Sequence, residues 1–303
     1  MTGRGRFAPS PSGRMHLGNV FAALLAWLSA RSQNGEFILR IEDLDPQRSK
    51  MEYIYAIRED LCWLGLDWDA EMPLQSEQNG VYSHYFNFLR EQNLVYPCFC
   101  TRNELHDASA PHGTDGQLLY SGRCRNLTEE ERRNMTRKGA WRVCVPADEV
   151  TFTDGVYGEV SERLDSACGD FIIRRSDGVF AYQLAVVCDD ALGGITEVVR
   201  GVDLLSSTPR QIWLYKTLGF TPPNFCHVPL LVAPDGRRLS KREKDLDLGH
   251  LRQTMSAEKL IGKLAYLAGL TEKPEAIAAK ELIGAFAWGK ISRENIPISD
   301  NFC

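Results

Sequence analysis

One segment near the start of the chain has the residue types that a polyphosphate-binding loop needs. It runs from Arg6 to Asn19 and reads Arg-Phe-Ala-Pro-Ser-Pro-Ser-Gly-Arg-Met-His-Leu-Gly-Asn. Gly13 and Gly18 remove side-chain bulk, so the backbone can approach phosphates, and the amide groups at the start of a following helix can donate to phosphate oxygens. His16 can hydrogen-bond the same oxygens as negative charge shifts during a displacement. The segment therefore predicts a polyphosphate site.

A basic loop late in the chain could act on the same phosphates. Residues 237–242 read Arg-Arg-Leu-Ser-Lys-Arg and follow Pro234-Asp235-Gly236, a turn that would present a flexible loop. Lys241 could neutralise the charge that builds on an α-phosphate and a leaving pyrophosphate, the stabilisation on which phosphoryl-type transfer depends. A solvated basic face is the alternative interpretation.

Three acids follow an apolar run at residues 39–45, which read Leu-Arg-Ile-Glu-Asp-Leu-Asp. The ends of strands in a Rossmann-type sheet are where ligands bind, so Glu42 could grip a substrate ammonium group. Arg6 and Arg200 are candidates for binding carboxylates, because the planar guanidinium can hold a carboxylate with two hydrogen bonds. The alternative for the acids is a turn that caps a helix.

Cysteines provide a candidate metal site. Cys98 and Cys100 are closely spaced and Cys124 follows within the same region, so three thiolates could enclose a tetrahedral zinc ion. Ordinary buried cysteines are the alternative interpretation. The candidates for the fourth ligand are Tyr120, His106 and His112.

Composition limits the class of protein. The chain has 303 residues, 44% of them hydrophobic and 25% charged, which suits a globular protein with a substantial core. Its longest apolar run, Val20 to Leu28, is too short to cross a bilayer, and nine scattered cysteines do not suggest a disulfide framework. We therefore expect a soluble, cytoplasmic protein. A net charge of -5 argues against nonspecific coating of nucleic acid, although basic residues concentrate at 123–142 and 237–244.

The elements that would carry these residues have an α/β order. A strand at 4–8, a helix at 17–31 and a strand at 36–41 predict a parallel crossover unit of Rossmann type, and 51–63 reads as a further helix. The sheet is expected to resume with strands at 195–199 and 226–232 around a helix at 209–218.

The predicted organisation has four parts. Residues 1–76 and 192–236 would form the two halves of a Rossmann catalytic domain. Residues 77–191 would form an inserted α+β domain, with short strands at 141–145 and 171–174. Residues 237–303 would hold the basic loop and a helical C-terminal subdomain, because the composition from Ser256 onward is helical.

Several segments together resemble the class I aminoacyl-tRNA synthetases, and among them the glutamyl-tRNA synthetases. His16-Leu17-Gly18-Asn19 is similar to the HIGH signature, with Asn in place of the usual fourth residue, and residues 237–242 are similar to the KMSKS signature. Arg-Ile-Glu-Asp at 40–43, Trp63 to Trp68 and Gln75-Ser76 also resemble the glutamyl family, so the resemblance spans most of the first 76 residues. A class I catalytic core with an inserted zinc-bearing domain is the fold that it implies.

The resemblance also implies roles for individual residues. It implies catalytic His16 and Lys241, with Tyr182, expected on a strand, and Arg200 in segments similar to those that line the amino-acid pocket. The glutamate-binding residues would be Arg6, Phe7, Ala8, Pro9, Ser10, Glu42, Tyr182 and Arg200. The residues for ATP, which would bind with Mg²⁺, would be Pro9, Gly13, His16, Gly18, Asn19 and Lys241. One structural Zn²⁺ would be held by Cys98, Cys100, Tyr120 and Cys124.

The length after the basic loop bears on the acceptor. Only 62 residues follow Lys241, too few for the anticodon-reading region of full glutamyl-tRNA synthetases. The chain resembles a truncated branch of the family that attaches glutamate to the base queuosine in the anticodon loop of tRNA(Asp), and Leu204 after Asp203 fits that branch. We expect a monomer that activates glutamate without tRNA. The alternatives are a truncated enzyme that charges the 3′ end of tRNA(Glu) and a noncatalytic paralogue that binds glutamate or ATP.

Overall fold

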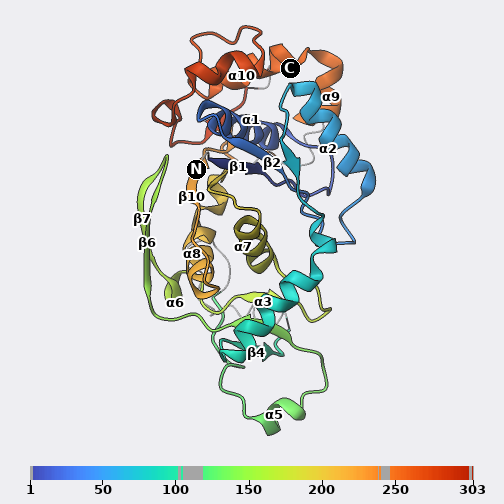
Figure 1. Ribbon diagram of the computed structural model, residues 1–303, viewed down its shortest axis with the longest axis vertical. Coiled ribbons are helices and arrows are strands. Elements are labelled where there is room, and N and C mark those ends of the chain that lie inside the picture. Colours follow the sequence, from blue (N-terminus) through green and yellow to red (C-terminus); the bar gives the residue numbers. More distant parts are fainter. Residues whose placement is uncertain are drawn as a thin grey trace.

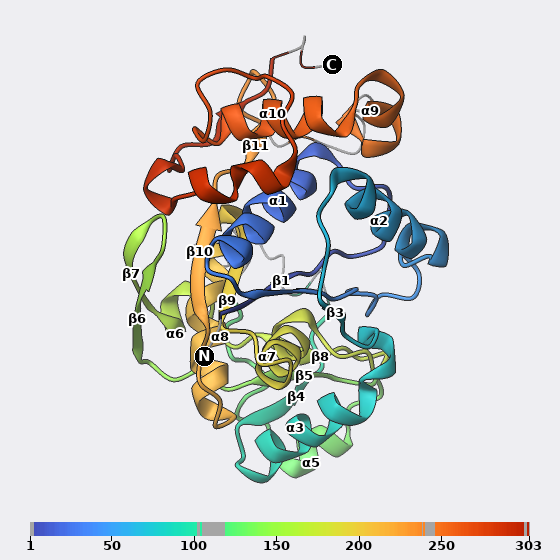
Figure 2. The ribbon, with the colours of Figure 1, turned by 45° about the horizontal axis from the view of Figure 1, so that its top comes forward.

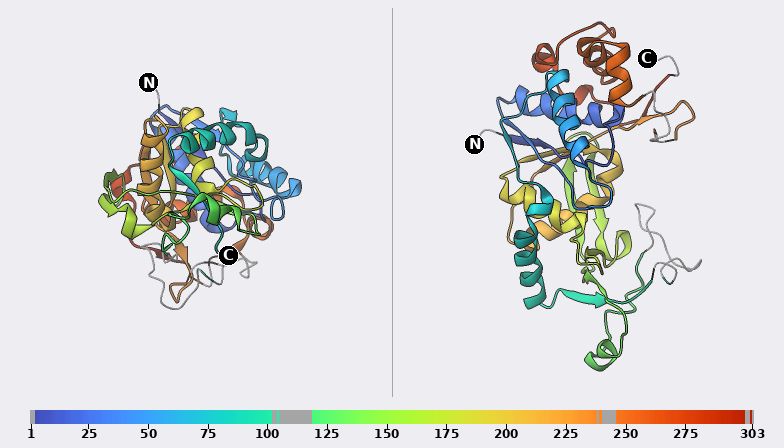
Figure 3. Two further views of the ribbon diagram at one scale, coloured as in Figure 1. Left: turned by 90° about the horizontal axis from the view of Figure 1, so that it is seen from below. Right: turned by 90° about the vertical axis from the view of Figure 1, so that its right-hand side faces the viewer.

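The computed structural model describes residues 3–101, 104, 119–237, 239, 246–299 and 302, and these form an elongated molecule (Figures 1 and 3). Helices α9 (Leu248–Thr254) and α10 (Ala257–Leu267) lie at one end. Strand β4 (Val95–Cys98) and helix α5 (Glu129–Arg133) lie at the other end, and the sheet that carries the candidate site lies between them.

The first half of the chain forms the predicted parallel unit. Strands β1 and β2 pair in parallel from Arg4↔Glu36 to Phe7↔Leu39, and β3 pairs in parallel with β2. The connection from β1 to β2 is helical because residues 17–32 combine apolar side chains with few helix breakers. The elements are β1 (Arg4–Phe7), α1 (Leu17–Ser32), β2 (Glu36–Leu39), α2 (Met51–Leu64) and β3 (Ala70–Glu71).

The second half adds strands beside β1. Strand β9 (Glu197–Gly201) lies along β1, where Thr196 N donates to Arg4 O at 2.9 Å, and it pairs in parallel with β10 (Asn224–Val228). Helix α8 (Thr208–Thr217) connects them. Strand β6 (Glu149–Asp154) joins the far side of β10 at Phe225↔Asp154 and forms a hairpin with β7 (Gly158–Arg163).

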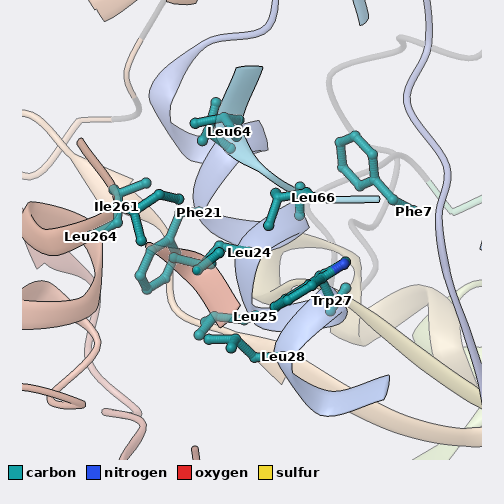
Figure 4. Packing of buried hydrophobic residues seen from close by; sticks show 14 of the residues in the cluster. Phe7, Phe21, Leu24, Leu25, Trp27, Leu28, Leu64, Leu66, Ile261 and Leu264 are labelled. Carbon is teal, nitrogen blue, oxygen red and sulfur yellow. The ribbon is translucent and has the colours of Figure 1, made fainter. Parts of the chain in front are cut away.

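A layer of apolar side chains fixes α1 against its neighbours (Figure 4). Phe21, Leu24 and Leu25 of α1 are fully or almost fully buried in one cluster with Ile261 and Leu264 of α10. Figure 2 shows the C-terminal segment over α1 on the side away from the sheet. Burying side chains of this size stabilises the fold by about 1.5–3 kcal/mol each. The core therefore holds the start of α1, which carries the candidate phosphate loop, in a fixed place.

The remaining elements connect and cover these sheets. Strands β4, β5 and β8 form a separate antiparallel sheet, and β11 pairs in parallel with β12 near the C-terminus. Their bounds are α3 (Asn79–Glu91), β5 (Ala140–Val143), α6 (Leu164–Ala167), β8 (Ile172–Arg174), α7 (Tyr182–Leu192), β11 (Leu231–Val232) and β12 (Ile296–Pro297). Short 3-10 helices span Gln75–Glu77, Val202–Ser207, Ala279–Ala285 and Trp288–Lys290.

Three sequence predictions are wrong in detail. Tyr182 opens helix α7 and is not on a strand; residues 184–190 of α7 are all buried, so no helical periodicity marks them. The strand expected at 226–232 divides into β10 and β11 around Pro229, which has no N–H for a sheet ladder. The tail is α-helical only as far as Leu267, and 3-10 turns and a short strand follow.

The cysteines and the helices each have one further property that bears on the class of protein. The eight cysteines within the described ranges are all free thiols. In the part of the chain that the structure describes, the helices fall short of the length and apolar character that crossing a bilayer would require.

Candidate active site

A cavity of about 590 Å³ opens where β1, β9 and β10 end and α1 begins. It brings together twelve of the thirteen predicted glutamate and ATP residues, and Lys241 lies outside the described residues. The twelve are Arg6, Phe7, Ala8, Pro9, Ser10, Gly13, His16, Gly18, Asn19, Glu42, Tyr182 and Arg200. Further lining comes mainly from Arg14, Met15, Asp203, Leu204, Leu230 and Leu239. We call this space the first cavity.

His16 is the N-cap of α1, and its ring orientation is set locally. The Nδ1 atom accepts a hydrogen bond from Gly18 N at 3.1 Å, while Asn19 Oδ1 accepts from His16 N at 3.3 Å. In the neutral ring that accepts at Nδ1, the proton is on Nε2, which makes Nε2 a donor. Asn19, the unusual fourth residue of the signature, thus closes a reciprocal helix cap. The Gly18 position has little spare room, because a Cβ there would lie 3.1 Å from the His16 ring.

Arg200 is held in the cavity wall by a buried histidine. Its Nε donates to His227 Nε2 at 3.1 Å, and its Nη2 donates to Thr208 Oγ1 at 2.8 Å. The other ring nitrogen, His227 Nδ1, lies 2.6 Å from Asp154 Oδ2. Because Nε2 accepts from a permanently charged arginine, the proton of the neutral ring lies on Nδ1 and is donated to Asp154. Nη1 of Arg200 donates to the Tyr182 hydroxyl at 3.4 Å.

The protonation states of His227 and Asp154 follow from their burial and their neighbours. Burial lowers the pKa of His227 to about 4, and the neighbouring Arg200 acts in the same direction, while Asp154 opposes both. Burial also disfavours ionised Asp154, yet the hydrogen bonds from His227 and from the backbone of Tyr157 and Val156 outweigh it, so the pKa of Asp154 is lowered. At neutral pH the ring is therefore neutral, and Asp154 is ionised.

Arg6 and Glu42 are linked beneath the cavity by a second buried network. Arg6 Nε donates to Asp190 Oδ1 at 3.3 Å, and Arg6 Nη1 donates to Val199 O at 3.0 Å. Arg40, which has no exposed surface, contacts the same Asp190 oxygen and donates to Glu42 Oε1 at 3.0 Å. Asp190 and Arg40 thus fix the two predicted pocket residues relative to each other.

The acids in this network differ in pKa. Burial raises the pKa of Glu42, and Arg40 only partly offsets that effect. Burial acts in the same direction on Asp190, but Arg40 and Arg6 outweigh it, so the pKa of Asp190 is lowered. Asp190 is therefore an ionised partner for the arginines. The ionised form of Glu42 is instead stabilised further when a cation enters the cavity.

The arrangement suits a small zwitterion beside a polyphosphate. Arg6 and Arg200 offer guanidinium groups for carboxylates, and Glu42 offers a carboxylate for an ammonium group. The start of α1, with His16, offers donors for phosphates at another wall of the same cavity. Two reactants bound in this way would lie next to each other, which is the geometry for transfer between them.

A second cavity of about 380 Å³ adjoins the first, and Ser10, Ser12, Glu42 and Tyr182 line both. Its other walls carry charged groups from two segments, Asp45 and Arg48 from one and Arg175 from the other. A third reactant could therefore approach the amino-acid end of the first cavity from this side.

The cysteine cluster forms as the spacing predicts. The sulfur atoms of Cys98, Cys100 and Cys124 lie within 4.8 Å of one another, which is the sole metal-type grouping among the described residues. The Tyr120 hydroxyl is 3.7 Å from Cys100 Sγ, and it accepts a hydrogen bond from Cys124 N at 2.7 Å. His106 and His112, the competing fourth ligands, lie outside the described residues. Burial and the neighbouring thiols raise the pKa of Cys100 to about 11.

Sequence reasoning missed the residues that orient the pocket. His227 is the one buried polar residue of β10, and Asp190 follows Asp189 at the end of a fully buried stretch of α7. Polar residues in such stretches require partners, because an unpaired buried polar group is costly. That signal could have marked both residues, although it would not have identified Asp154 or Arg40 as their partners.

The chain is similar to known proteins over almost its whole length. The family described as tRNA synthetases class I (E and Q), catalytic domain, matches residues 3–297. A glutamyl-Q tRNA(Asp) synthetase of Symbiobacterium thermophilum is 48% identical over 309 aligned positions, which cover 97% of this chain and 95% of that protein. A protein of the same name from Nitratidesulfovibrio vulgaris is 47% identical, with coverage of 93% and 91%.

Solved structures agree with this fold. A glutamate tRNA ligase from Elizabethkingia meningosepticum, solved in complex with its amino acid, superposes with a TM-score of 0.84 at 29% sequence identity. The match covers 99% of this chain and 67% of that one. The α/β architecture with a parallel sheet is thus that of a class I synthetase catalytic domain.

Proposed function

Because the chain belongs to the class I tRNA synthetases of the E and Q group, we propose that it activates glutamate with ATP and transfers it to queuosine in tRNA(Asp). The observation that carries the activation step is the first cavity, in which Arg6, Arg200 and Glu42 surround one end and His16 lies at another wall. The names of the two relatives support the acceptor.

In the proposed first step, the α-carboxylate of glutamate attacks the α-phosphate of ATP. A bond forms between the carboxylate oxygen and phosphorus, and the bond to pyrophosphate breaks, which leaves glutamyl-adenylate. His16 Nε2–H would donate to phosphate oxygens as charge moves to the leaving group, and Lys241 would act likewise from the basic loop. Pro9, Gly13, Gly18 and Asn19 would shape the loop around the nucleotide, with Mg²⁺ bound to the phosphates.

Glutamate would occupy the end of the cavity near β9. Arg200 and Arg6 would hold its two carboxylates, and Glu42 would accept from its ammonium group. Tyr182 and the backbone from Phe7 to Ser10 would complete that end. His227 and Asp190, which hold the two arginines, would act as positioning residues because they do not line the cavity.

In the proposed second step, a hydroxyl of the queuosine ring attacks the adenylate carbonyl and AMP leaves. The acceptor would enter through the second cavity, which shares Glu42 and Tyr182 with the first. No residue is assigned as a general base, because holding the hydroxyl next to the carbonyl can account for much of the rate.

The cysteine cluster supports a proposal for one structural Zn²⁺. Three convergent sulfur atoms are the soft donor set that zinc prefers, and Tyr120 oxygen is the fourth ligand that we propose. The ion would tie β4 to the segment around Cys124 and so stabilise the inserted domain, for which we keep the bounds 77–191.

Residues 1–76 and 192–236 would form the catalytic domain, and 237–303 a helical C-terminal subdomain. We propose a cytoplasmic location, since ATP and tRNA are its substrates, and we keep the monomer as the proposed oligomeric state.

The test is glutamate-dependent exchange between ATP and pyrophosphate without tRNA. We expect exchange in the wild type and its loss in His16→Ala and Lys241→Ala. We also expect the wild type to transfer labelled glutamate to tRNA(Asp) that carries queuosine but not to unmodified tRNA(Asp). Exchange only after addition of tRNA(Glu), with label on its terminal adenosine, would favour a truncated glutamate tRNA ligase, as the structural match allows. Glutamate or ATP binding without exchange under any condition would favour a noncatalytic paralogue.

A further inference from the structure

Asp60 is a buried carboxylate that two arginines from distant parts of the chain contact. It lies in α2 with none of its side chain exposed. Its Oδ1 accepts from Arg14 Nη2 at 3.0 Å and from Arg252 Nη1 at 2.8 Å. Arg14 belongs to the loop between β1 and α1, and Arg252 belongs to α9, so one oxygen atom joins three segments.

The joined segments meet at the nucleotide side of the first cavity. Leu248 N, at the start of α9, donates to Met15 O at 2.8 Å, and Asp247 forms a β-bridge with His16. Helix α9 lies beside α2 (Figures 1 and 2) and follows the basic loop in sequence. Of the two arginines that contact Asp60, Arg14 lines the cavity and Arg252 does not.

A carboxylate in this place is not explained by stability alone. Removing a carboxylate from water is expensive, and apolar residues of similar volume often stabilise a core equally well. Both arginines share one oxygen atom of Asp60, and one of the two, Arg14, also lines the cavity. A polyphosphate is attracted by such a corner, provided that Arg14 is held toward the cavity wall.

We propose that Asp60 is a positioning residue for nucleotide binding, which holds Arg14 in the cavity wall and ties α9, the helix that follows the basic loop in sequence, to the same point. This inference rests on the proposed function, because it takes the nucleotide of the first cavity to be ATP. Asp60 itself does not touch the cavity.

The direction of the effect of Asp60→Asn separates position from charge. The substitution removes a negative charge near a polyanion, so electrostatics alone would make ATP bind more tightly. If Asp60 acts by position, the neutral amide oxygen of Asn holds the two arginines less firmly than the carboxylate does, and ATP binds about tenfold more weakly. The two explanations therefore predict changes of opposite sign.

Arg252→Gln tests the link from a position outside the cavity. Asp60 keeps Arg14 as a partner in this variant, so it is expected to fold even if Asp60→Asn does not. We expect weaker ATP binding, about threefold to tenfold. In the double variant Asp60→Asn/Arg252→Gln, the second substitution should add little, because the link is already broken.

The experiment measures the dissociation constant of a nonhydrolysable ATP analogue by calorimetry, and the Tm, for each variant of the full chain. Leu64→Ala is the control, since Leu64 is buried in α2 one turn from Asp60 and belongs to the apolar core. We expect the control to lower the Tm without weakening ATP binding. Tighter or unchanged binding in Asp60→Asn and Arg252→Gln, or equal weakening in Leu64→Ala, would overturn the inference. A wild type that binds no ATP analogue would instead refute the proposed function, and this inference with it.

Discussion

The buried His227 ring predicts a particular pH dependence of stability. Its pKa is lowered from 6.5 to about 4 in the folded protein, chiefly by burial. Between these values the unfolded chain takes up a proton that the folded chain does not, so the free energy of unfolding falls as the pH falls. A tenfold change in proton affinity corresponds to about 1.4 kcal/mol, so this group alone removes about 2 kcal/mol between about pH 7 and pH 5.

His227→Gln removes the titrating ring but keeps an acceptor for Arg200. At neutral pH we expect the variant to be less stable by about 1–3 kcal/mol, because Asp154 loses a hydrogen bond to a charged group. As the pH falls toward 5, only the wild type bears the His227 penalty, so the two free energies of unfolding should converge. Three buried acids with raised pKa values titrate in both proteins and cancel in the difference, namely Glu42, Asp60 and Asp189.

Urea unfolding of both proteins across this pH range, followed by tryptophan fluorescence, measures the difference directly. The quantity of interest is the wild-type free energy of unfolding minus that of His227→Gln at each pH. A difference that stays constant from neutral pH to about pH 5 would refute the assignment of His227 as a neutral buried ring. A difference that grows on acidification would mean that the ring is stabilised in its charged form by Asp154.

A methyl group at Gly18 would lie 3.1 Å from the His16 ring, so Gly18→Ala should lower kcat for ATP–pyrophosphate exchange about tenfold with little change in Tm. An unchanged kcat would argue that the orientation of the His16 ring does not matter for the exchange reaction. His227→Asn can still donate to its carboxylate partner but cannot reach Arg200, so the KM for glutamate should rise about tenfold while the KM for ATP stays constant; equal rises in both would indicate general damage. Cys98→Ser should lose the proposed zinc, measured by plasma emission spectrometry, and lower the Tm; wild type purified without zinc would contradict the metal proposal.

The conformation of the candidate phosphate loop could be predicted from the sequence because its parts are contiguous. His16, Gly18 and Asn19 interact with one another through the first turn of α1, so their spacing alone contains the geometry. The same holds for the crossover from β1 to β2, which short-range apolar patterns specify. Contacts between residues that are close in the sequence could therefore be predicted from the sequence.

The support of the pocket could not be predicted in the same way. Arg200, His227 and Asp154 come from three strands, and the contact between His227 and Asp154 spans 73 residues. Such a contact depends on how β6 joins β10, which no local pattern encodes. Tyr182 illustrates the same limit, because its helix is buried on all sides and carries no periodicity that distinguishes it from a strand.

These long-range contacts also explain how the proposed glutamate pocket, which is rich in charge, can be ordered before its ligand arrives. Arg6 is fixed by Asp190, Arg200 is fixed by neutral His227, and each of these partners is buried and held in turn by a further residue. A neutral partner leaves the full charge of Arg200 available to a substrate carboxylate, whereas a second aspartate there would compete with it. The arginines need little reorientation on binding, which reduces the entropy that is lost when a small ligand is captured. If Arg200 binds glutamate as proposed, the histidine behind it serves affinity, and the Asn and Gln variants at His227 separate its two contacts.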